Sequence, residues 1–140
     1  MSVKSLIAAV VSMFFLAGVA IARTPAPEGA QVYIISPADG ERVSNPVTVR
    51  FGLDGMGVAP AGVDKPGTGH HHLLIDAVQP PAYDTPLPAD DHHKHFGGGQ
   101  TETRIELAPG KHTLQLILGD QNHIPHDPPV MSEIITINVE

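Results

Sequence analysis

Hydrophobic and polar residues alternate in several short stretches of the chain. In the stretch 46–53, Val47, Val49 and Phe51 fall at every second position, with polar or small residues between them. Alternation with a period of two is typical of a strand with one buried face, and no helical periodicity appears after residue 22. The pattern predicts six strands, at 31–35, 46–53, 70–78, 101–107, 112–118 and 132–139.

Turn residues separate these stretches. The chain contains 14 glycines and 14 prolines, and both occur in the segments 37–40 and 108–111 between predicted strands. Short strands joined by such turns are typical of a small sandwich. We therefore predict an all-β fold, an antiparallel immunoglobulin-like β-sandwich of six to seven strands. The segment 79–100 is too long for an ordinary loop, which predicts that it is functional or poorly ordered.

The first 22 residues have the layout of a secretory signal peptide. Lys4 precedes an apolar run over 6–21, and small residues at positions 20 and 22 end it. The run is shorter than the roughly 20 residues that a membrane-spanning helix needs. We therefore expect cleavage after Ala22, with an uncleaved membrane anchor as the alternative. The expected product is a single domain over 23–140 in a bacterial periplasm, with no stable membrane span.

Composition excludes several function classes. The chain has no cysteine, which rules out disulfides, thiolate metal sites and cysteine nucleophiles. Its formal net charge of −7, without a basic face, argues against a nucleic-acid partner. No serine lies in the Gly-x-Ser-x-Gly motif of a hydrolase, and the adjacent acids at 90 and 91 fall in a predicted loop. We therefore predict that the protein is not an enzyme.

Histidine is the residue type that carries a functional signal. The nine histidines occupy positions 70–72, 92, 93, 95, 112, 123 and 126. Side chains two residues apart in a strand project from the same face, about 6.6 to 7 Å apart. His70 and His72 can therefore converge on one ion, whereas His71 is expected to point into the core. The same relation joins His93 and His95.

Strand pairing predicts which of these segments meet. We expect the strand that starts at His70 to pair antiparallel with the strand 112–118. This pairing places His70 beside the residues that follow position 118. A hairpin between 101–107 and 112–118 would bring His95 to the same end, while His112 is expected at the opposite end.

The predicted metal site therefore takes ligands from three segments. Asp120 is expected either as a ligand or as a hydrogen-bond acceptor that orients an imidazole. Its residues are His70, His72, His93, His95, Asp120 and His123. Met56 and Met131 are expected near the same end. Imidazole with thioether suits copper, especially Cu(I), whereas imidazole with carboxylate suits zinc or Cu(II).

These residues predict binding of a transition metal, copper in the first place and zinc in the second, for carriage or buffering. The alternative is a non-catalytic interaction module of the cell envelope, with another envelope protein as its partner. In that case the histidines would serve packing or respond to pH.

Three stretches of the chain resemble a known family. They are 69–76 (GHHHLLID), 95–102 (HFGGGQTE) and 107–123 (LAPGKHTLQLILGDQNH). Together they are similar to motifs of small exported bacterial domains of unknown function, and the resemblance covers nearly all of the chain after residue 22. It implies an exported, compact β-domain with these histidine segments, and it implies no established chemistry.

Overall fold

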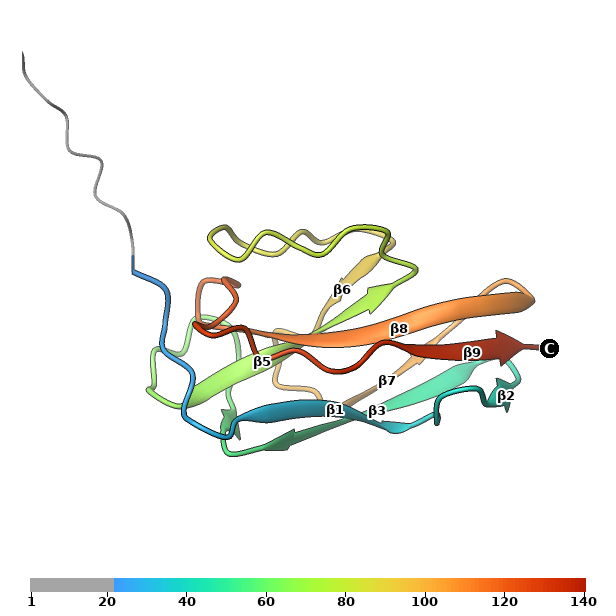
Figure 1. The fold of residues 1–140 in the computed structure, drawn as a ribbon, viewed down its shortest axis with the longest axis horizontal. Coiled ribbons are helices and arrows are strands. Elements are labelled where there is room, and N and C mark those ends of the chain that lie inside the picture. Colours follow the sequence, from blue (N-terminus) through green and yellow to red (C-terminus); the bar gives the residue numbers. More distant parts are fainter. Residues whose placement is uncertain (1–21) are drawn as a thin grey trace, which may run out of the picture.

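Two β-sheets form the fold in the computed structural model, which describes residues 22–140 (Figure 1). The strands are β1 (Gln31–Ser36), β2 (Arg42–Val43), β3 (Val47–Asp54), β4 (Gly57–Val58), β5 (Thr68–Ile75), β6 (His93–His95), β7 (Glu102–Ile105), β8 (Gly110–Gly119) and β9 (Ile135–Val139). The described residues contain no helix, so the prediction of an all-β sandwich is confirmed. The predicted signal peptide lies outside the described residues except for Ala22.

The number of strands exceeds the predicted six to seven because three of the nine are very short. β2, β4 and β6 have only two or three residues each, too few to produce a visible alternation. The six longer strands match the six predicted stretches, although their ends differ. β5 stops before Asp76, whose positive φ of 53° turns the chain out of the sheet. Within residues 22–140, no helix has the length and apolar character to cross a membrane.

The larger sheet has the order β2-β9-β8-β5-β4, and β6 also pairs with β5. As predicted, β5 and β8 are antiparallel, with His70 opposite Gly119 and Ile75 opposite Leu114. β4 pairs with the beginning of β5, at Thr68 and Gly69, and β6 pairs with its later part. The beginning of β5 therefore lies beside the end of β8.

The predicted hairpin between 101–107 and 112–118 is wrong. β7 belongs to the smaller sheet, of order β1-β3-β7, where it runs antiparallel to β3. The connection to β8 is tied to the chain before β3: the Asn45 side chain donates to the Leu107 carbonyl at 2.6 Å and accepts from the Leu107 amide at 3.0 Å. Alternation shows that a strand has one buried face. It does not show which sheet the strand joins, because both sheets have an apolar inner face.

The core lies between the two sheets. Leu73, Leu114 and Leu116 from the larger sheet are fully buried against residues such as Val49 from the smaller one. His71 shares this face of β5, as predicted, and its ring centroid lies 5.1 Å from that of Phe51. The side chains on the inward face of β5 are therefore part of the core.

The outward face of β5 carries His70, His72 and Leu74. Residues 76–92, here named the covering segment, lie on the side of β5 and β8 opposite β1 and β3 (Figure 1). Leu87 of this segment packs with Leu74 and Ile117 in a second apolar cluster. The long segment thus buries part of the outer face, and the two histidines lie next to the apolar cluster along the strand.

Candidate metal site

Four histidines meet on the outer face of the larger sheet, and we name them the histidine group. They are His70 and His72 of β5, His95 of β6, and His123 of the loop that follows β8. Each offers one ring nitrogen, and these four nitrogens all lie within 4.8 Å of one another. The structure thus brings together four of the six predicted site residues.

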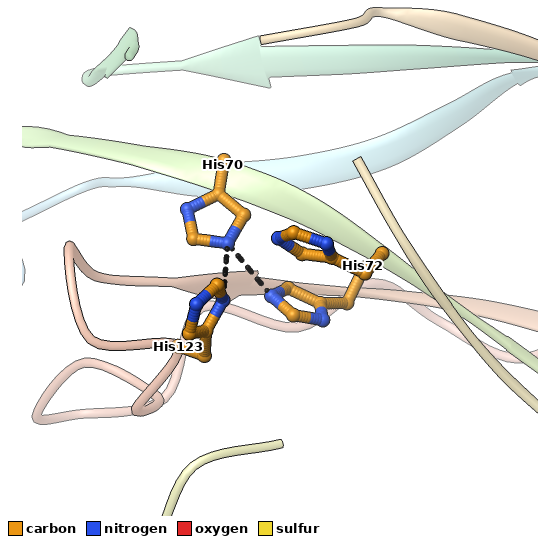
Figure 2. A group of neighbouring side chains, drawn as sticks. His70, His72 and His123 are labelled. Atoms are coloured by element: carbon orange, nitrogen blue, oxygen red, sulfur yellow. Dashed lines mark hydrogen bonds between the residues drawn. The ribbon is translucent and has the colours of Figure 1, made fainter. Parts of the chain in front are cut away.

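The spacing within the histidine group suits a metal ion. His70 Nε2 lies 3.0 Å from His72 Nε2 and 3.1 Å from His123 Nδ1 (Figure 2). A neutral imidazole nitrogen carries either one hydrogen or one lone pair, so His70 Nε2 can satisfy only one of the two contacts. Tetrahedral ligands about 2.0 Å from an ion are about 3.3 Å apart. The two contacts of His70 Nε2 are already close to this separation, and the remaining pairs, which lie within 4.8 Å, would have to close by at most about 1.5 Å around an ion.

Strand geometry places three members of the group. His70 and His72 share the outward face because they are two residues apart on β5. β6 runs antiparallel to β5 with His95 opposite His72, and the centroids of these two rings are 5.1 Å apart. His95 thus joins the site through direct pairing with β5 and not through the expected hairpin.

A tight loop places His123. Its φ is +66°, a left-handed conformation that is uncommon for a residue other than glycine and persists only where the surroundings impose it. Asp120 provides that constraint: its Oδ1 accepts from the amides of Asn122 at 2.8 Å and Ile124 at 3.0 Å. Its Oδ2 accepts from the Thr24 hydroxyl at 2.6 Å. The buried Asp120 carboxylate therefore lies outside the group and positions the loop that carries His123.

His93 is the other predicted residue that lies outside the histidine group. It pairs with Leu74, one strand repeat beyond the His72–His95 pair and away from His70. Its Nδ1 lies 2.8 Å from Asp90 Oδ1. His93 and His95 do have the predicted spacing of two residues, but the register of β6 on β5 brings only His95 to the group.

Three other histidines have structural partners. His112 lies at the opposite end of β8, as predicted, with Nδ1 2.7 Å from Asp76 Oδ2. His126 is buried with Nε2 3.1 Å from the Thr68 carbonyl, and His92 Nδ1 lies 2.8 Å from the Ile75 carbonyl.

The two methionines serve as packing residues. Met56 packs against the larger core cluster, and Met131 packs with the second apolar cluster. The Tyr83 hydroxyl also lies 3.4 Å from Met131 Sδ. The expected thioether contribution to the site therefore has no support from these contacts.

Burial favours the uncharged form of three members of the histidine group, His70, His72 and His95. It lowers the pKa of His70 to about 4, with further lowering by His123 and His95. Burial followed by the repulsion of His70 lowers the pKa of His72 to about 3. The pKa of His95 is also lowered, by desolvation first and by His123 second. Metal ligation requires neutral imidazole, so the lowered pKa values of these three rings favour the form that binds an ion.

Two glycines make room for the rings, a feature that the sequence analysis did not identify. A Cβ on Gly119 would lie 2.8 Å from His72 Nε2, and a Cβ on Gly97 would lie 2.3 Å from His95 Cε1. Real Cβ atoms do not approach other atoms so closely. The glycines that follow β6 and end β8 were a visible signal, but their role depends on a strand register that the sequence does not reveal.

Comparison with known proteins identifies a family without a known activity. A family model described as a domain of unknown function (DUF4399) matches residues 49–140, which include the whole histidine group. Comparison with curated proteins gives no match, and comparison with solved structures gives none either. The resemblance to domains of unknown function is thereby confirmed: the chain belongs to the DUF4399 family.

Proposed function

We propose that this domain binds one transition-metal ion through His70, His72, His95 and His123, and that it carries or buffers that ion. The observation that supports the proposal is the convergence of four ring nitrogens within 4.8 Å. His70 and His72 are only 1% and 2% exposed, and they place polar nitrogens where packing alone would favour apolar side chains. Their Nδ1 atoms are also buried, without a hydrogen-bond partner among the described residues.

The donor set favours copper, followed by zinc. Imidazole nitrogen suits copper, zinc and nickel, whereas magnesium and calcium take oxygen ligands. For divalent ions at a nitrogen site, affinity is highest for Cu²⁺ and lower for Zn²⁺. The group contains no thioether, so Cu²⁺ replaces Cu⁺ as the favoured copper ion.

A binding role fits the number of ligands better than catalysis. Structural zinc sites use four protein ligands, whereas catalytic zinc sites use three and leave a position for water or substrate. The histidine group offers four. Together with the predicted signal peptide, this supports the proposal of a non-catalytic metal carrier in the periplasm.

Titration of the tag-free, metal-free protein with Cu²⁺ and with Zn²⁺ tests the proposal. We expect one ion per chain, with a Kd below about 10 μM and tighter binding of Cu²⁺. His70→Ala should abolish this binding. His112→Ala is the matched control, because it removes an imidazole from the opposite end of the same strand pair. Absence of a site in the wild type, or wild-type affinity in His70→Ala, would contradict the proposal.

A further inference from the structure

The four members of the histidine group differ in their access to solvent. The side chains of His70 and His72 are buried, and His123 is half-buried. His95 is the exposed member, and it lies on a three-residue strand. The open side of the site is therefore the side on which His95 lies.

The backbone of His95 is nevertheless fixed. His95 pairs with His72 across the two strands. The next residue, Phe96, donates its amide to the His71 carbonyl at 3.1 Å, and its buried ring lies 4.9 Å from that of Phe51 between centroids. Once its bond to an ion is broken, His95 can therefore move away by rotation of its side chain alone, and such rotations of exposed side chains take nanoseconds or less.

Local space determines where the His95 ring lies. The ring rests against the bare Cα of Gly97, where a Cβ would be 2.3 Å from its Cε1 and 2.6 Å from its Nε2. His123 is more constrained, because Asp120 holds the loop that carries it. The backbone carbonyl of His123 also accepts from the Leu87 amide at 2.8 Å. Among the four ligands, His95 is the one that can leave while the other three stay in place.

We propose that the ion enters and leaves by ligand exchange at the His95 position, which makes the domain a transfer protein and not a store. The partner is a metal-binding molecule that presents a nitrogen or sulfur donor on this open side. Its donor forms a bond to the ion as the bond to His95 breaks, with no change of oxidation state. His70, His72 and His123 hold the ion until further donors replace them. This inference rests on the proposed function.

Transfer of Zn²⁺ to the chromogenic chelator 4-(2-pyridylazo)resorcinol tests the exchange. We expect the transfer rate of the zinc-loaded wild type to rise with chelator concentration, because the chelator attacks the bound ion. His95→Ala should still bind one ion and transfer it at least about tenfold faster, since one ligand is absent. A rate independent of chelator concentration, or a wild-type rate in His95→Ala, would overturn the inference.

A glycine pair provides a test that keeps all four histidines. Gly97→Ala should displace the His95 ring and accelerate transfer, whereas Gly98→Ala should not, because its Cβ would approach only the flexible Gln100 side chain. Equal transfer rates in these two variants would contradict the role of His95. Failure of the wild type to bind any ion is a different result, which would refute the proposed function itself.

Discussion

The two ends of the β5–β8 pair use histidine in opposite ways. At one end, His70 and His72 face other imidazoles, and burial lowers the pKa of both. At the other end, His112 faces Asp76, and the hydrogen bond between them raises the pKa of His112. His112 Nε2 also lies 2.7 Å from the Ala108 carbonyl, so both of its nitrogens face acceptors and the charged form satisfies both. The surrounding residues thus shift His70 and His72 toward the neutral form that binds a metal, and His112 toward the charged form.

Each end also has its own structural task. Asp76 begins the covering segment, and besides His112 it accepts the Thr113 amide at 2.8 Å. The hydrogen bonds of Asp76 therefore fasten the covering segment to β8. The histidine group has no acid among its members, and burial favours neutral rings at His70 and His72, which leaves their lone pairs for an ion.

Gly119→Ala should have the largest effect, because it disturbs the histidine group and leaves the His112 end of the β5–β8 pair unchanged. The new Cβ would displace His72 Nε2, so we expect metal affinity to fall by about 10- to 100-fold, as it does when support of a ligand is lost. Gly57→Ala is the control, because its Cβ would meet only Thr68 Cγ2 at 3.6 Å. Isothermal titration of both variants with Zn²⁺ measures the difference. Equal affinities would show that the position of His72 does not matter.

Acid should weaken the metal-free protein through its buried histidines, which are His70 and His72 of the histidine group and His71 of the core. The pKa values of about 4 for His70 and about 3 for His72 lie below the value of about 6.5 in the unfolded chain. The unfolded chain therefore binds more protons, and stability falls as pH drops below about 6.5. We expect the Tm to fall by about 5 °C or more between pH 7 and pH 5.5 in the presence of a chelator. A flat profile would contradict the burial of neutral rings.

The His112–Asp76 pair should have the opposite pH dependence. A raised pKa in the folded protein means that its stabilisation is complete below about pH 6.5 and is lost as pH rises through the folded value. Because solvent screens the partly exposed Asp76, we expect His112→Ala to lower the free energy of unfolding by only about 1 kcal/mol at pH 6. The decrease should be smaller at pH 8, where less of the His112 imidazole is protonated. Urea unfolding at both pH values measures this. Metal affinity should stay unchanged.

Thr24→Val should have the smallest effect. It removes the hydroxyl that donates to Asp120 Oδ2 at 2.6 Å, while both loop amides still bind the other carboxylate oxygen. We expect metal affinity to fall by no more than about fivefold, since the net contribution of one hydrogen bond is about 1 kcal/mol. Thr24→Ser should restore it. Wild-type affinity in Thr24→Val, or a failure of Thr24→Ser to restore the affinity, would contradict the role of this hydrogen bond.

The sequence predicted the face of a strand on which a side chain lies better than it predicted which strands pair. The period of two correctly separated outward His70 and His72 from inward His71, because side-chain direction in a strand depends only on the alternation. It could not choose between His93 and His95, which share a face and differ only in register on β5. It also could not assign β7 to its sheet, because both sheets bury the same kind of residue.

The role of Asp120 shows a second reason for such limits. A carboxylate between histidine segments has the chemistry of a ligand, and the prediction included it for that reason. In the fold, both of its oxygens are used by Thr24 and by the amides of Asn122 and Ile124. Those partners depend on the loop conformation and on a segment 96 residues earlier in the chain, which residue type and spacing do not reveal.

X-ray absorption by the zinc-loaded protein counts the ligands of the ion and so measures directly whether the four imidazoles bind it. We expect four imidazole nitrogens at about 2.0 Å, and three in His72→Ala if that variant retains the ion. His112→Ala should give the wild-type spectrum. A sulfur neighbour at about 2.3 Å, a shell dominated by carboxylate oxygen, or an unchanged imidazole count in His72→Ala would contradict this expectation.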